Sequence, residues 1–155
     1  PGTFQMSLGI EMIRDVYEAT EIFFCNKEEA RRILNTPGAE LPELLKGLHA
    51  LGPKIVVITE GPKGATTFDG TNTWFMPMYP DPKPPYERTG AGDAFASTVT
   101  AALALGKPLE EALTWGPINS MSVVQFVGAQ KGQLSREKIE EYLHSAPPEY
   151  SLKKL

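Results

Sequence analysis

The residues most able to do chemistry lie in one glycine-punctuated turn, residues 87–97, which leads directly into an alanine-rich apolar segment. Gly90 and Gly92 carry no Cβ, so the backbone there can take positive φ and come close to a ligand. The free N–H groups and positive dipole end of the helix expected to follow favour a bound phosphate. Asp93 would repel that anion unless it has a chemical task, and in phosphoryl transfer a carboxylate accepts the proton of the attacking hydroxyl. The turn therefore predicts an anion-binding site with a general base beside it.

A structural role is the alternative for this turn, because Asp is a favoured helix N-cap and Gly is common in turns. The full string of residues 89–95, Thr-Gly-Ala-Gly-Asp-Ala-Phe, closely resembles the second signature of the ribokinase-like (PfkB) carbohydrate kinases. The resemblance implies that Gly90, Ala91 and Gly92 form an anion hole and that Asp93 is the catalytic base. It also implies ATP as phosphoryl donor, Mg²⁺ as its metal and a sugar hydroxyl as acceptor.

Two other functions stay open beside the sugar kinase. An adenosine-type nucleoside kinase of the same superfamily shares this part of the chain almost wholly. A non-catalytic nucleotide-binding or assembly module would keep the anion cradle without phosphoryl transfer. ATP turnover against a panel of sugars and nucleosides distinguishes these alternatives.

Two residues of the turn depart from the pattern of the family. Glu87 stands where Asp is usual, and Arg88 stands where Thr or a small residue is usual. In many members the Asp is associated with a monovalent-cation site. Because Glu is one methylene longer than Asp, the question of whether Glu87 belongs to a K⁺ site stays open.

Composition limits the partners and the cellular setting. The chain has 155 residues, a net charge of −4 and a pI near 5.2, with scattered basic residues, which argues against nucleic acid as a partner. The single cysteine, Cys25, lies in an apolar run, where a buried small side chain is favoured over a reactive thiol. We find no secretory signal or long apolar span, so the sequence predicts no membrane partner and a reducing, cytoplasmic setting.

Helical and strand patterns alternate along the chain, which predicts an α/β fold with βαβ units. The resemblance makes this a three-layer α/β/α sandwich of ribokinase type. The predicted segments are a packing helix at 7–18, a strand at 21–25, helices from 26 and from 41 to 51, a buried strand at 54–59, and a hairpin at 65–68 and 73–78.

Further nucleotide-binding residues follow the two predicted strands. Asn26 and Glu29 have the spacing of an N-cap with its capping-box partner. By resemblance they also belong to the phosphate and Mg²⁺ region, with Glu29 acting on Mg²⁺ through water. Residues 59–65 resemble the nucleotide segment of the family, which assigns Thr59, Gly61 and Gly64 to ATP, while a plain hairpin turn is the alternative.

Helices are predicted from Asp93 to about residue 105, from Pro108 to about residue 125, and after Ser135. By resemblance, Gly128 and Ala129 border the adenine pocket. Asn119 is a candidate adenine contact, although many members have Asn where this chain has Pro117. We expect the tail to residue 155 to fray.

The resemblance covers nearly the whole chain and matches the C-terminal half of such a kinase, residues 1–155 of this sequence. It implies that an N-terminal half and a lid, which carry most sugar contacts, lie outside this sequence. We therefore expect the missing half or a homo-oligomer as partner, bound at an unpaired apolar sheet edge near residues 22–25. We also expect these residues alone not to phosphorylate a sugar.

Overall fold

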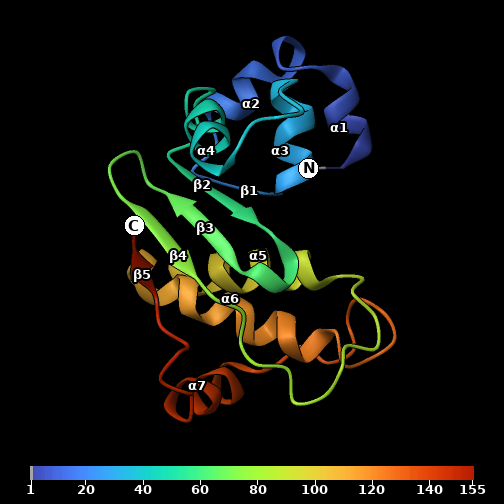
Figure 1. Cartoon of the computed structure of the whole chain (residues 1–155), viewed down its shortest axis with the longest axis vertical. Coiled ribbons are helices and arrows are strands. Elements are labelled where there is room, and N and C mark those ends of the chain that lie inside the picture. Colours follow the sequence, from blue (N-terminus) through green and yellow to red (C-terminus); the bar gives the residue numbers. More distant parts are fainter. Residues whose placement is uncertain (1) are drawn as a thin grey trace. The chain divides into compact units, whose positions relative to one another are not determined.

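The computed structural model describes residues 2–155 (Figure 1). The chain forms two compact units: the first runs from the N-terminus to Phe75 and includes Lys154–Leu155, and the second runs from Met76 to Lys153. One mixed sheet has the strand order β1-β2-β3-β4-β5. With the helices of both units, it gives the α/β composition that the sequence predicts.

Strands β1 (Ile22–Asn26) and β2 (Ile55–Thr59) are parallel, and Asn26 lies opposite Thr59 at the end of the register. Strand β3 (Ala65–Phe68) runs antiparallel to β2, and β4 (Thr73–Met76) follows it in the sheet. The middle of β2 is fully buried, as its run of β-branched residues predicts. The parallel pair places the ends of β1 and β2 at one edge.

Helices α3 (Lys27–Leu34) and α4 (Leu41–His49) connect β1 to β2 and pack against the strands (Figure 1). Pro42 is tolerated in α4 because it lies in the first turn, where its missing N–H has no helical partner. The core of this unit lies between these helices and the sheet; its fully buried side chains include Leu44, Leu48, Val56 and Ile58. Cys25 belongs to the same core, and burial raises the pKa of its thiol to about 12. It is the buried small side chain that the sequence predicts.

The helix predicted at 7–18 is wrong as a single element. The segment contains α1 (Thr3–Leu8), a 3₁₀ turn (Glu11–Ile13) and α2 (Arg14–Glu18). Gly9 has φ of +78°, which ends α1, and Met12 is exposed rather than packed. Periodicity alone did not reveal this break, since apolar residues continue on both sides of it.

The hairpin prediction is confirmed, although β4 ends at Met76 rather than at residue 78. Asp69 organises the turn: its Oδ1 accepts hydrogen bonds from the backbone N–H groups of Thr71 (2.8 Å) and Asn72 (2.6 Å). These bonds lower the pKa of Asp69 against the opposing effect of its burial, and Gly70 supplies a positive φ of +89°.

The second unit contains α5 (Ala91–Ala104), α6 (Leu109–Val123) and α7 (Arg136–His144). Helices α5 and α6 pack along each other, which the small side chains of α5 permit. Trp115 on α6 is 2% exposed and belongs to the core. Helix α7 begins after Ser135, as predicted, and Ser135 caps it by accepting from the N–H of Lys138.

The expected fraying of the tail is wrong. Tyr150 is buried and its hydroxyl donates to the carbonyl of Thr114. At the chain end, β5 (Lys153–Lys154) joins the sheet, and the N–H of Leu155 donates to the carbonyl of Thr73 at 2.9 Å. Over the described residues, no helix has the length and apolar character needed to cross a membrane.

Candidate functional site

Helix α5 begins at Ala91, two residues before the predicted start, and Gly90 is its N-cap with φ of +81°. Only Gly90 uses the conformational freedom expected of both glycines, since Gly92 is helical. Asp93 lies in the first turn of α5 and is not the N-cap. The structural alternative for Asp93, a helix cap, is therefore wrong.

The first turn of α5 has backbone donors that the protein leaves unused. No side chain caps the helix; the N–H of Ala94 donates to the carbonyl of Gly90 (2.8 Å) and that of Ala91 to the carbonyl of Arg88 (3.3 Å). Within residues 2–155 we find no acceptor for the N–H of Gly92 or Asp93, and both residues are exposed. A Cβ placed on Gly92 would meet no atom within 4 Å. Two exposed backbone donors at the positive end of a helix thus have no partner within residues 2–155, an arrangement that suits an anion.

Gly90 packs directly against the loop that contains Gly128 and Ala129. A Cβ on Gly90 would lie 2.6 Å from the Cβ of Ala129 and 2.7 Å from its Cα, so only glycine fits. Gly128 has φ of +90°. Two segments that are far apart in the sequence, both predicted to belong to the site, therefore lie together in the second unit.

Glu87 holds the same two segments together by hydrogen bonds. Its Oε2 accepts from the N–H of Gly128 at 3.2 Å, and the side chain of Thr89 also donates to its carboxylate. Both bonds lower the pKa of Glu87 below its usual value, and the bond from Thr89 has the larger effect. The carboxylate thus has a structural role in this loop. A K⁺ ion would have to bind a carboxylate that is already hydrogen-bonded.

The assignment of Asn119 to adenine needs correction. Asn119 is 3% exposed, and its Nδ2 donates to Oγ1 of Thr98 (2.7 Å) and Oε1 of Gln133 (2.6 Å). Its Oδ1 accepts from the N–H of Leu134 at 2.9 Å. Both amide donors are used within the protein, so the side chain joins α5, α6 and the following loop and has no donor left for a base.

Asn119→Leu should lower the free energy of unfolding by about 1–3 kcal/mol, because the N–H of Leu134 and the hydroxyl of Thr98 would lose their buried partner. Denaturant unfolding measures the change, with Gln5→Leu, at an exposed amide of α1, as a control for loss of an amide elsewhere. If Asn119 contacted adenine, the variant would instead keep its stability and lose ATP affinity.

Sequence reasoning missed a neighbouring contact on α6. Ser120 is 3% exposed, and its Oγ donates to the carbonyl of Ala91, in the first turn of α5, at 2.7 Å. Ser122 is 9% exposed and donates to the carbonyl of Gly132 at 2.7 Å. The run Asn-Ser-Met-Ser at 119–122 was the available signal, because several polar residues in a buried helix need partners.

The first unit holds the other predicted nucleotide residues. The capping box of α3 is confirmed: Oδ1 of Asn26 accepts from the N–H of Glu29, and Oε2 of Glu29 accepts from the N–H of Asn26, both at 2.9 Å. Thr59, beside Asn26 in the register, donates from its hydroxyl to the carbonyl of Cys25 at 3.5 Å. The sheet thus brings Asn26 and Thr59 together at the carboxyl end of parallel strands, where open α/β sheets bind ligands.

An open cavity of about 520 Å³ lies at this edge. Gly61 is part of its lining and begins a 3₁₀ turn (Gly61–Lys63) in the connection from β2 to β3. Gly61 and Gly64 both have positive φ, +57° and +101°, so this connection requires both glycines. The remaining lining residues are Asn26, Lys27, Glu28, Arg31, Thr59, Glu60 and Lys63.

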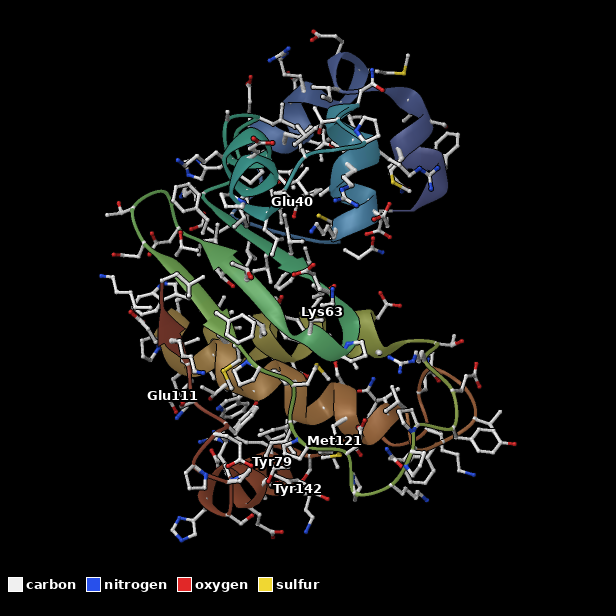
Figure 2. All side chains as sticks on the ribbon, viewed as in Figure 1. Glu40, Lys63, Tyr79, Glu111, Met121 and Tyr142 are labelled. Carbon is white, nitrogen blue, oxygen red and sulfur yellow. The ribbon has the colours of Figure 1, made fainter. Side chains whose placement is uncertain are left out.

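Acidic partners neutralise part of the positive charge at the cavity. Lys27 Nζ lies 2.9 Å from Oε2 of Glu40 and 3.5 Å from Oε1 of Glu60. Lys63 is exposed on the 3₁₀ turn, and Figure 2 labels it together with Glu40. Over residues 2–155 no three His, Cys, Asp or Glu side chains gather in a way that could hold a metal ion.

Comparisons with known proteins agree with these features. The model of the pfkB family carbohydrate kinases matches residues 4–136. A cytidine kinase of Thermococcus kodakarensis is 36% identical over 106 residues, which are 68% of this chain and 37% of the relative.

Two solved structures share the fold. The nucleoside kinase of Methanocaldococcus jannaschii, described as an archaeal member of the ribokinase family, has a TM-score of 0.79 and 26% identity over 94% of this chain and 46% of its own. The ribokinase of Arabidopsis thaliana, solved with ribose and ATP, has a TM-score of 0.76 and 25% identity over 84% of this chain and 43% of its own. The chain thus spans less than half the length of these relatives. With a family match over most of its residues and a shared α/β fold, it belongs to the pfkB family of carbohydrate kinases.

Proposed function

We propose that the protein containing this chain is an ATP-dependent kinase that transfers the γ-phosphate to a sugar hydroxyl. The observation that carries the proposal is the exposed first turn of α5, where the N–H groups of Gly92 and Asp93 have no acceptor among residues 2–155 and the exposed carboxylate of Asp93 lies in the same turn. A helix start that only ended a loop would gain stability from a capping side chain, and this one has none.

Each group in this turn has a distinct task in the proposed mechanism. Gly90 sets the direction of the turn, and its contact with Ala129 holds the turn in place. The N–H groups of Gly92 and Asp93 stabilise negative charge on the transferred group, aided by the dipole of α5. The carboxylate of Asp93 accepts the proton of the acceptor hydroxyl as that oxygen attacks.

The residues of the chain fit ATP and Mg²⁺. Asn26, Thr59 and Gly61 line an open cavity at a sheet edge, and Gly128 and Ala129 lie against the anion-binding turn. Within the first unit we assign Asn26 to the phosphate region and Thr59 and Gly61 to ATP, and within the second unit we assign Gly128 and Ala129 to the adenine pocket. Glu29 uses Oε2 in its capping box, which leaves Oε1 for a metal-bound water. When bound, ATP would supply the phosphoryl group and Mg²⁺ would neutralise its charge. Mg²⁺ usually keeps several waters and needs no cage of protein carboxylates.

A nucleoside acceptor is the second candidate, because the curated relative at 36% identity is a cytidine kinase. Sugar kinases and nucleoside kinases would share the phosphate-binding turn and the base. Residues other than those named above would therefore determine which acceptor is phosphorylated.

The extent of the chain bears on the same question. Because it spans less than half of its relatives, we propose that residues 1–155 form the C-terminal part of one kinase domain. Residues that hold the acceptor would then come from the rest of the protein or from a second copy. Alone, this part should not phosphorylate a sugar, since alignment of the hydroxyl supplies much of the catalysis.

Activity should depend little on K⁺, because the carboxylate of Glu87 is already engaged by Thr89 and the N–H of Gly128. Titration of the full-length protein with K⁺ against Na⁺ at fixed ionic strength measures this dependence. A large activation selective for K⁺ would show that a cation site exists despite these bonds.

The function itself is tested by ADP release and product mass for the full-length protein with Mg·ATP and a panel of sugars and nucleosides. We expect release that depends on a sugar, with phosphate added to one hydroxyl. Turnover with nucleosides alone would favour the second candidate. ATP binding without turnover on any acceptor would indicate a non-catalytic module.

A further inference from the structure

Ser120 makes an unusual contact for a serine within a helix. A serine at such a position commonly donates to the carbonyl four residues earlier in its own helix. The hydroxyl of Ser120 instead donates across to α5, to the carbonyl of Ala91 at 2.7 Å, and the residue is only 3% exposed. The contact thus joins the buried face of α6 to the first turn of the helix that carries Asp93.

The contact acts on one particular peptide group. The carbonyl of Ala91 and the N–H of Gly92 belong to the same planar trans peptide, so they point in opposite directions. A hydrogen bond that fixes the carbonyl therefore also fixes the direction of the N–H. That N–H is one of the two donors of this turn without an acceptor in the described part of the chain, and no side chain of that part caps the start of α5.

We infer that Ser120 is a positioning residue that aims the N–H of Gly92 at the transferred phosphoryl group. The inference rests on the proposed function of the turn. Catalysis by such donors depends on their being aligned before the charge develops, so a hydroxyl behind the peptide contributes without touching the substrate. Ser120 would then affect the rate of transfer far more than the affinity for ATP.

The neighbouring Ser122 provides a matched control. It lies on the same helix, is also buried, and donates to a carbonyl at the same distance of 2.7 Å, but that carbonyl belongs to Gly132. Ser122→Ala removes the same chemical group as Ser120→Ala and leaves the peptide between Ala91 and Gly92 untouched. A general loss of packing in α6 would affect both variants alike.

The test combines an amide signal with kinetics in the full-length protein. Protein labelled with ¹⁵N-glycine is titrated with inorganic phosphate, and the Gly92 signal is assigned by its disappearance in Gly92→Ala. In the wild type and in Ser122→Ala we expect phosphate to shift this signal. In Ser120→Ala the shift should be much smaller. The kcat should fall about tenfold with little change in the KM for ATP. This fall is smaller than the roughly 10²–10³-fold cost of removing an anion-hole donor itself. Ser120→Thr keeps the hydroxyl, so it should restore the phosphate-induced shift and kcat. Thermal unfolding checks that this variant has the native fold.

The possible outcomes distinguish a failure of this inference from a failure of the proposed function on which it rests. If phosphate does not shift Gly92 in the wild type, the anion-binding role of the turn fails and the inference fails with it. If the shift is present and Ser120→Ala leaves both the shift and kcat unchanged, the inference alone is overturned. Equal losses in Ser120→Ala and Ser122→Ala would also overturn it, because they would indicate a structural role for both hydroxyls.

Discussion

Asp93→Asn should lower kcat by roughly 10²–10⁴-fold, the usual contribution of a general base. The amide has nearly the same shape as the carboxylate but cannot accept the proton of the acceptor hydroxyl. Affinity for ATP should stay the same or rise slightly, since a negative charge beside the bound phosphate is removed. Steady-state kinetics and calorimetry on the full-length protein measure the two quantities separately.

Two controls distinguish the loss of a base from a general effect of charge or stability. Asp15→Asn makes the same change on α2, at an exposed aspartate of the other unit, and should leave kcat unchanged. A carboxylate in the first turn of a helix also stabilises it by about 0.3–1 kcal/mol, so unfolding of Asp93→Asn should be measured. A loss of that size is small beside the roughly 5–15 kcal/mol by which folded proteins are typically stable. Near-wild-type kcat in Asp93→Asn would refute its role as the base.

Gly90→Ala should abolish most activity and destabilise the protein. Gly92→Ala should lower the activity without a loss of stability. Alanine at φ of +81° costs about 1–3 kcal/mol, and its methyl would also overlap Ala129, 2.6 Å away. The turn and the 128–129 loop must then move apart. Denaturant unfolding should show the loss of stability, and ADP release the loss of activity.

Gly92→Ala places the same methyl group on a helical residue where no atom lies within 4 Å. Stability should be unchanged or rise by up to about 1 kcal/mol, because Ala is the better helix former. The methyl would occupy the space in front of the unused donors, so ATP affinity and kcat should both fall. If Gly92→Ala kept full activity, that space would not be where the phosphate binds.

Much of the first unit was predictable because its signals are local. Asn26 and Glu29 have capping-box spacing, Asp69 and Gly70 suit a tight turn, and the β-branched run of β2 indicates a buried strand. In each case a few adjacent residues determine the structure. The predictions there were wrong mainly at element ends, and in the helix expected at 7–18, where Gly9 interrupts a continuous apolar pattern.

The second unit was less predictable because its key contacts join distant residues. The sequence identified Gly90 and Asp93, but the start of α5 at Ala91 depends on how the turn packs against Ala129. Asn119 was assigned to a ligand because its partners, Thr98 and Leu134, are known only from the packing of α5, α6 and the following loop. Buried hydrogen bonds between elements leave no spacing pattern in the sequence.

A crystal structure of the full-length protein with Mg²⁺ and a non-hydrolysable ATP analogue tests the central claim most directly. We expect the terminal phosphate to accept hydrogen bonds of about 2.7–3.2 Å from the N–H groups of Gly92 and Asp93. The carboxylate of Asp93 should face the open side of that phosphate, where an acceptor hydroxyl would bind. A terminal phosphate bound elsewhere, with the first turn of α5 facing only solvent, would show that this turn is not the phosphate site.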